Sequence, residues 1–297
     1  MRDVPPRAVH VPVLLREAAA LLLAGGPRRV VDGTLGLGGH AGEILGSDAG
    51  LCLLGIDRDG GLVRAARARL AEFGTRFMAA QGSYADLQEH MARIGWEQAD
   101  GVLLDLGYCS AQVDDPTRGF SFNHDAPLDL RFAPEEGETA AALLERLTEE
   151  ELSAVIAAYG EERAARRIAR ALKEALPRTT GQLAAAVSRV KGRGRAERIH
   201  PATRVFQALR IAVNGELEHL DRFLRRFHRV LSPGGRAVVI AYHSLEDRMV
   251  KEAFARLHAE GFGTLVTKHA LRPSPEEVKR NRRSRSARLR AFALKAA

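Results

Sequence analysis

The stretch Val30-Val-Asp-Gly-Thr-Leu-Gly-Leu-Gly-Gly-His40 runs from an apolar strand into a glycine-rich turn. A second apolar strand, Leu53-Leu-Gly-Ile-Asp57, follows and ends in an acid. Glycines let the backbone turn tightly and approach a ligand, and the helix after the turn begins with free N–H groups. The acid can accept hydrogen bonds from ribose hydroxyls. This order predicts the first half of a Rossmann-like nucleotide-cofactor site.

The glycine loop leaves two cofactors open. Gly36-x-Gly38-x-x-Ala41 fits the dinucleotide fingerprint, which is typical of NAD sites. Asp32 favours S-adenosylmethionine, because an acid at the end of the first strand would crowd a pyrophosphate. S-adenosylmethionine carries an ammonium and a sulfonium instead. An NAD(P)-dependent oxidoreductase is therefore the alternative to a methyltransferase.

Composition points to a nucleic-acid partner. The 297-residue chain has a formal net charge of +8, and its 45 basic residues include only six lysines. Arginine suits bidentate phosphate contacts and base stacking, although the codon usage of a GC-rich genome explains the arginines equally well. Two cysteines argue against a disulfide framework and fit a reducing cytoplasm. The apolar run 18–24 is too short to span a membrane.

Apolar strands alternate with amphipathic helices through the first third of the chain, which predicts a doubly wound parallel sheet. A long polar segment, 107–135, breaks this pattern; helices follow, and the next strand is expected at 237–241. We predict an α/β fold, a Rossmann-like class I S-adenosylmethionine-dependent methyltransferase with an inserted α-helical domain. Residues 1–111 and 201–297 form the methyltransferase domain, and 112–200 form the helical substrate-recognition domain.

Four local features are expected around the inserted domain. A capping box starts a helix at Thr148-x-x-Glu151. One long helix begins after Pro201, because apolar residues recur in steps of three and four from 206 to 231. Pro233-Gly-Gly235 forms a turn, and residues 289–294 form the last strand.

Two candidate catalytic residues follow expected strands. Asp105 could accept an N–H of an exocyclic amine that receives a methyl group, or it could bind the cofactor. His243 is a candidate proton acceptor or base contact. A thiolate at Cys109 could instead add to a pyrimidine ring, but a cysteine without a flanking proline or basic residue is more often a small loop residue.

Two segments are candidates for contacting RNA. In the first, Arg118 could hold a phosphate, and Phe120 and Phe122 could either stack on a splayed base or pin the loop to the core. Asp129 belongs to the same charged segment. The second segment, 279–290, has seven basic residues and no acid, and its candidate RNA contacts are Arg283, Arg285 and Arg288.

Taken together, the motifs resemble the bacterial ribosomal RNA small subunit methyltransferase H family. They span nearly the whole chain in the family's order, which makes them far more specific than a glycine loop. The matching stretches are 10–15, 32–40, 55–59, 105–107 with Ser110 and Gln112, 118–122, 127–129, 200–204, 206–210, HSLEDR at 243–248 and RSRSARLR at 283–290.

The resemblance implies a cytoplasmic enzyme that transfers methyl from S-adenosylmethionine to N4 of one cytidine in the decoding region of 16S rRNA, on the small ribosomal subunit. No metal is implied, and whether the protein forms a homodimer stays open. The cofactor contacts implied by the resemblance are Gly38, Gly39, His40, Asp57, Tyr84, Asp105 and Gln112.

Four departures from the family pattern concern the candidate site. Tyr84 stands where relatives commonly have phenylalanine, which keeps the aromatic face. Tyr108-Cys109 and Ala111 stand where relatives usually have a small residue, serine and proline. A serine at the cysteine position weakens the thiolate hypothesis, and the absent proline predicts a looser loop at 108–111.

Overall fold

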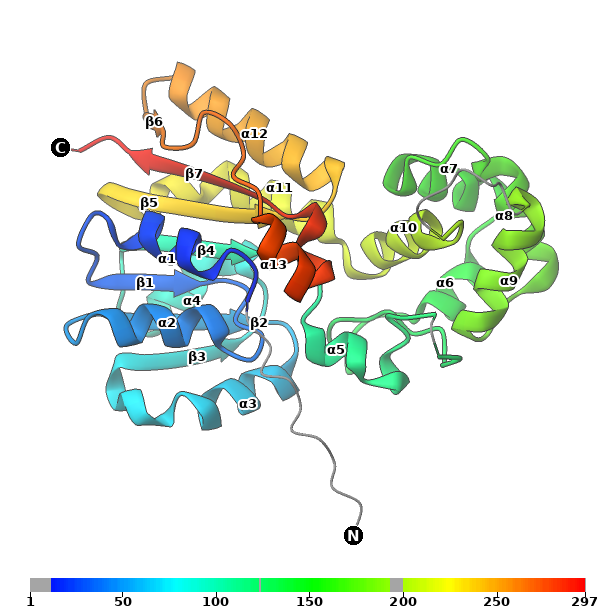
Figure 1. Cartoon of the computed structure of the whole chain (residues 1–297), viewed down its shortest axis with the longest axis horizontal. Helices are drawn as coiled ribbons and strands as arrows, with labels where there is room; N and C mark the ends of the chain where they lie inside the picture. The colour runs from blue at the N-terminus through cyan, green and yellow to red at the C-terminus, as the bar shows by residue number, and fades with distance from the viewer. Residues whose placement is uncertain (1–11, 123, 193–199, 297) are drawn as a thin grey trace, which may run out of the picture. The chain divides into compact units, whose positions relative to one another are not determined.

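A computed structural model describes residues 12–122, 124–192 and 200–296. The chain divides into two compact units, both drawn in Figure 1. The sheet unit comprises the chain up to Gly107 and from Leu220 onward, and the helical unit comprises Tyr108–His219.

The strand order β3-β2-β1-β4-β5-β7-β6 defines the sheet unit. Strands β1 to β5 pair in parallel with one another, and β7 is antiparallel to both β5 and β6. The order reverses between β1 and β4, as in doubly wound folds, and confirms the predicted Rossmann-like α/β class. The strands are β1 (Arg29–Asp32), β2 (Cys52–Asp57), β3 (Phe77–Gln81), β4 (Ala99–Asp105), β5 (Leu231–Ala241), β6 (Gly263–Leu265) and β7 (Arg288–Leu294).

Two apolar cores cover the two faces of the sheet. Successive residues of a strand point to opposite faces, so Val30 packs with Leu22 and Ile44, whereas Val31 packs in the core of Phe223 and Phe254. The first core takes side chains from α1 (Leu15–Leu23), α2 (Gly39–Ser47) and α3 (Gly60–Arg69). The second takes them from α4 (Leu87–Arg93), α11 (Glu216–Arg226) and α12 (Ser244–Ala259).

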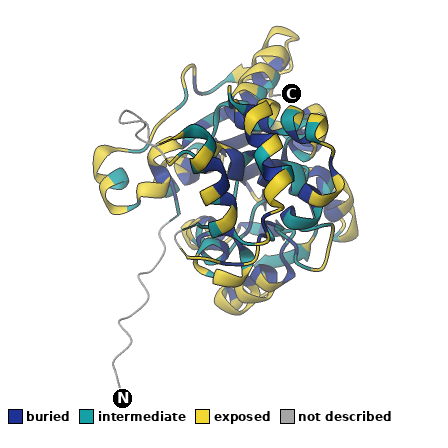
Figure 2. Cartoon of the chain, turned by 90° about the vertical axis from the view of Figure 1, so that its right-hand side faces the viewer, coloured by how far each residue is buried: buried dark blue, intermediate teal, exposed yellow. Residues whose placement is uncertain are grey.

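The helical unit has its own apolar core, in which Leu152, Ile168 and Leu209 are fully buried. Its helices show buried and exposed faces, as amphipathic helices do (Figure 2). The predicted capping box at Thr148 and Glu151 is confirmed. The helices are α5 (Ser110–Asp114), α6 (Ala140–Arg146), α7 (Glu149–Gly160), α8 (Ala165–Ala175), α9 (Thr180–Lys191) and α10 (Thr203–Asn214).

The prediction of one long helix after Pro201 is wrong. The structure has two helices, α10 and α11, because Gly215 between them adopts a left-handed conformation (φ 58°) that ends the first helix. The apolar stripe continues across this break, so periodicity alone could not reveal it. Since α10 packs on α7, the unit boundaries follow Gly107 and His219, whereas the sequence placed them after residues 111 and 200.

Three smaller differences concern local structure. The expected turn at Pro233-Gly-Gly235 lies within β5, which starts at Leu231 and shifts its register against β4 between Ala99 and Gly101. The expected polar loop 107–135 contains α5 and a short 3₁₀ turn, and β6 was not predicted.

None of the helices in the described part of the chain is long and apolar enough to cross a bilayer.

Candidate functional site

Three acids end three neighbouring strands of the sheet unit. Asp32 is the last residue of β1, Asp57 of β2 and Asp105 of β4. Because β1 and β4 meet where the strand order reverses, these carboxyl ends face the position at which open α/β sheets bind ligands. The predicted grouping of the three acids along one edge of the sheet is therefore present.

Burial dominates the electrostatics of these acids. It raises the pKa of Asp32 and of Asp57 to about 6 and that of Asp105 to about 7, because a charged carboxylate loses its hydration there. Their mutual repulsion also raises the pKa of Asp32. In the described chain none of the three forms an ion pair with a lysine or arginine. Such a cluster suits a cationic ligand, whose charge would offset the repulsion.

The glycine loop is held by the second of these acids. Asp57 accepts hydrogen bonds from the backbone N–H groups of Gly36 (2.8 Å) and Asp59 (2.9 Å). Each carboxylate oxygen takes one of these bonds, so the group keeps accepting capacity for a ligand hydroxyl. Asp57 thus fixes the loop and remains able to bind a ribose.

Gly38 and Gly39 also have packing reasons to be glycine. Gly38 has φ 75°, and a Cβ there would lie 2.8 Å from Leu70 Cδ1. A Cβ on Gly39 would lie 2.3 Å from Pro12 Cγ. Larger residues would force the start of α2 away from its neighbours, so both glycines are needed to form the loop.

His40 lies buried beside the third acid. Its Nε2 is 3.2 Å from the carbonyl oxygen of Val13, and that acceptor assigns the ring proton to Nε2. Nδ1 then faces Asp105 Oδ2 at 3.7 Å. Burial lowers the pKa of His40, although the charge of Asp32 opposes this effect.

Two residues that the sequence analysis did not select fix Asp105. The hydroxyl of Tyr242 donates a hydrogen bond to Asp105 Oδ1 (2.6 Å), which lowers the pKa of this acid against the larger effect of burial. The backbone N–H of Asp105 donates to Thr34 Oγ1 (2.6 Å). The sequence carries a signal for each of them: Thr34 lies in the glycine loop, and Tyr242 directly precedes His243.

His243 has a local structural function. It is the N-cap of α12, and its Nδ1 accepts a hydrogen bond from the backbone N–H of Glu246 (3.4 Å). Its Nε2 lies 3.1 Å from Glu246 Oε1. Glu246 in turn accepts from the backbone N–H of Tyr242 (2.8 Å). This capping box positions the segment that carries Tyr242.

Tyr84 lies next to the glycine loop. A Cβ on Gly33 would be 2.9 Å from the Cβ of Tyr84, and the aromatic ring meets Phe223 edge-on at 5.9 Å. The ring is half-buried against the sheet unit's second core. Its position beside the loop agrees with the predicted cofactor contact.

The remaining predicted residues up to Asp129 belong to the helical unit. Gln112 is buried; its Oε1 accepts from the backbone N–H of Cys109 (2.9 Å), and its Nε2 donates to the carbonyl of Phe132 (3.4 Å). Cys109 is the N-cap of α5. Arg118 donates to the same Phe132 carbonyl at 2.8 Å. Gln112 and Arg118 thus tie the start of α5 to Phe132.

The two phenylalanines pack inside the helical unit. The ring of Phe120 stacks on Phe132 with centroids 5.7 Å apart, and Phe122 contacts Phe206 at 5.1 Å. Both rings border the unit's core, as in the pinning alternative. Asp129 forms a two-point ion pair with Arg131 (2.8 Å for each bond).

The basic C-terminal segment is only partly available for RNA. Arg288 and Arg290, both on β7, bind the carboxylate of Asp247 on α12, each at 2.7 Å. They tie the antiparallel strand to the helix. Arg283 and Arg285 are exposed in the 3₁₀ turn before β7.

Two similar proteins of known name belong to the same family. A relative from Sorangium cellulosum is 46% identical over 294 residues, which cover 97% of this chain and 92% of the relative. One from Myxococcus xanthus is 48% identical over 297 residues, which cover 95% and 96%. Both are called ribosomal RNA small subunit methyltransferase H.

Solved structures add little to this result. A putative rRNA-methylase from Clostridium thermocellum has a TM-score of 0.46 at 9% identity, over 97% of this chain and 100% of that one. The likeness is low, so the fold class rests on the strand order. The family model described as the MraW methylase family matches residues 7–295, nearly the whole chain. The chain is thus a methyltransferase and belongs to the MraW methylase family.

Proposed function

We propose that this enzyme transfers the methyl group of S-adenosylmethionine to N4 of a specific cytidine in the decoding region of 16S rRNA, within the small ribosomal subunit. The family match over residues 7–295, with relatives called ribosomal RNA small subunit methyltransferase H, carries this proposal. The same match favours a methyltransferase over the NAD(P)-dependent oxidoreductase that the glycine loop alone allows. The reaction belongs in the cytoplasm, and a homodimer stays a prediction that sedimentation of the purified protein tests.

The acids of the sheet unit fit S-adenosylmethionine. Asp32 is buried, Asp57 and Asp105 are half-buried, and none of the three has an ion-pair partner among the lysines and arginines of the described chain, so a ligand with an ammonium and a sulfonium suits them. Asp57 keeps acceptor sites for ribose hydroxyls. Bound there, S-adenosylmethionine supplies an electrophilic methyl group on a good leaving group. We assign the adjoining cofactor contacts to Gly38, Gly39, His40 and Tyr84, as the family resemblance implies.

Asp105 is the residue that we assign to the amine. In its ionised form it accepts an N–H of the cytosine N4 group and directs the nitrogen lone pair toward the methyl carbon. As the C–N bond forms and the S–C bond breaks, N4 becomes positively charged and must lose a proton. A carboxylate with a pKa of about 7 is a suitable acceptor for that proton.

The test is transfer of labelled methyl from S-adenosylmethionine to small subunits that lack the modification, followed by digestion to nucleosides. We expect the label in N4-methylcytidine. Asp105→Asn keeps the side-chain shape but cannot take the proton, so it should lower kcat by about 10²-fold or more. Label in 5-methylcytidine, or no label with cofactor binding intact, would contradict the proposal.

A further inference from the structure

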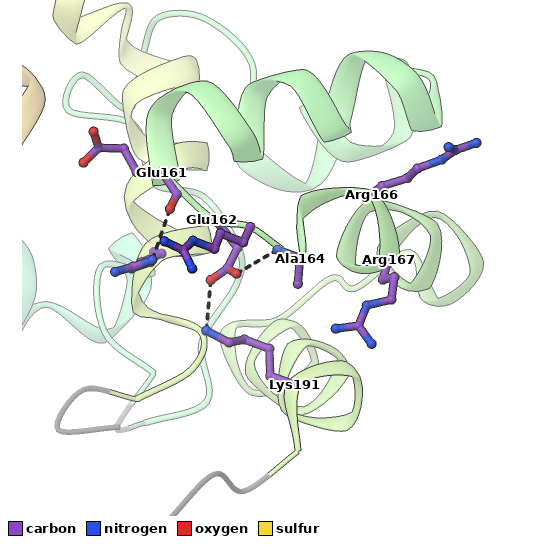
Figure 3. Close-up of a pocket in the computed structure, with 8 residues that line it drawn as sticks. Glu161, Glu162, Ala164, Arg166, Arg167 and Lys191 are labelled. Atoms are coloured by element: carbon purple, nitrogen blue, oxygen red, sulfur yellow. Dashed lines mark hydrogen bonds and ion pairs between the residues drawn. The ribbon is translucent and has the colours of Figure 1, made fainter. Parts of the chain in front are cut away.

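The helical unit contains a hollow of about 660 Å³ that the sequence analysis did not anticipate. It lies between the turn that joins α7 to α8, the end of α9 and the start of α10 (Figure 3). Five basic and two acidic side chains line it. The basic residues are Arg163, Arg166, Arg167, Lys191 and Arg204.

The two acids do not neutralise this pocket. Glu162 is buried and binds the backbone N–H of Ala164 (3.0 Å) and Nζ of Lys191 (2.9 Å). Burial alone would raise the pKa of Glu162, but these two bonds and the charges of Lys191 and Arg204 bring it below its usual value, so the carboxylate is ionised and pairs directly with Lys191. The carboxylate of Glu161 points away from Glu162 and Lys191 (Figure 3).

The arginines are left with their charges uncompensated. Arg163, Arg166 and Arg167 are exposed and have neither a hydrogen-bond nor an ion-pair partner in the part of the chain that the structure describes. Arg204 uses one N–H on the carbonyl of Glu161 (3.1 Å) and keeps other donors. In Figure 3 Arg167 extends to the side on which Lys191 lies, whereas Arg166 points away.

This arrangement has a cost for the free protein. Arg166 and Arg167 lie in the first turn of α8, where the helix dipole favours acids; that turn contains no acid, and Glu162, which binds the N-cap residue Ala164, is already paired with Lys191. Ala164, the N-cap, gives no side-chain cap. Neighbouring guanidinium groups at the positive end of a helix repel one another, and an anion placed among them would relieve that repulsion.

We infer that this pocket binds phosphate groups of the substrate RNA backbone and so helps the helical unit hold the small subunit. Phosphate contacts position a nucleic acid without reading its sequence, which suits a pocket whose lining is mostly arginine, lysine and glutamate. The inference rests on the proposed rRNA substrate. It adds Arg163 and Arg167 to the residues expected to contact RNA.

The test compares two double variants of the full-length protein. R163Q/R167Q removes two charges from the pocket, and R170Q/R189Q removes two exposed charges from α8 and α9 outside it. Affinity for unmodified small subunits is measured across salt concentrations. R163Q/R167Q should reduce the slope of log K against log salt by about 1–2, at roughly 0.7–0.9 per lost phosphate contact. R170Q/R189Q should keep the wild-type slope.

A third variant distinguishes the loss of charge from misfolding. R163K/R167K keeps both charges and should restore the slope, which a merely structural effect would not explain. Equal slopes for R163Q/R167Q and R170Q/R189Q would overturn the inference. Methyl transfer at saturating subunit concentration separates the two proposals. If wild type labels no cytidine but its slope still depends on Arg163 and Arg167, the proposed reaction fails and the phosphate pocket stands.

Discussion

Tyr242 controls the protonation of Asp105 through one hydrogen bond of 2.6 Å. Tyr242→Phe removes the hydroxyl that stabilises the carboxylate, so the pKa of Asp105 should rise from about 7. A hydrogen bond to a charged group contributes about 1.5–3 kcal/mol, which corresponds to roughly one to two pH units. The acid limb of the kcat/KM profile should therefore move to higher pH by that amount, with activity recovered near pH 9.

Tyr159→Phe is the matched control for this prediction. Its hydroxyl also donates to a carboxylate, that of Glu218 (3.0 Å), but it belongs to the helical unit. We expect its pH profile to match that of wild type. If Tyr242→Phe left the acid limb in place, Asp105 would not be the group whose ionisation limits the reaction.

Individual site residues differ in how far sequence predicts them. Asp32, Asp57 and Asp105 follow apolar strands, and parallel strands bring their carboxyl ends to one edge, so pattern suffices. The partner of Asp105 depends on register, because β4 pairs with β5 so that Asp105 faces Ile240, two residues before Tyr242. Phe120 lies in a polar segment, and only the packed helical unit shows that its ring stacks on Phe132.

At the scale of elements, one carboxylate joins α12 to β7. Asp247 is only 7% exposed and binds both Arg288 and Arg290. Asp247→Asn would leave two partly buried guanidiniums without their counter-charge, which typically costs about 3 kcal/mol. We expect the free energy of unfolding of the sheet unit to fall by that amount in a denaturant titration.

Asp221→Asn provides the comparison for this ion pair. Asp221 pairs with Arg225 one turn along α11 at 2.7 Å, but both side chains are largely exposed. Loss of such a pair should change stability by less than about 1 kcal/mol. Equal losses for the two variants would show that burial of the Asp247 cluster contributes nothing.

Replacing Arg288 would also destabilise β7, so RNA binding by the C-terminal segment is better tested at Arg283 and Arg285.

Strands and helices were more predictable than the breaks between them. The apolar strand predicted before the glycine turn is present as β1, because a short apolar run before glycines has few alternatives. Gly215 divides an unbroken apolar stripe, and nothing in the periodicity distinguishes a left-handed glycine from a helical one. β5 extends through Pro233 because an irregular register accommodates it beside β4.

The folded sheet brings together three carboxylates that would each be fully hydrated in the unfolded chain. Folding buries three acids, and burial raises the pKa of each toward 6–7 from an ordinary value of 3.8. A carboxyl whose folded pKa is raised binds more protons in the folded state, so the stability of the ligand-free protein should fall as pH rises from about 4 to 7.

A cationic ligand should reverse this trend, because it favours the ionised acids. We therefore expect the affinity for S-adenosylmethionine to increase between pH 5 and 8, with protons released on binding below about pH 7. Calorimetry in two buffers of different ionisation enthalpy measures that release. Asp32→Asn should reduce both the pH dependence and the number of protons released. An affinity that is flat with pH and a heat independent of buffer would mean that the three carboxylates keep their protonation state when the cofactor binds, and the cluster would then not be the cation site.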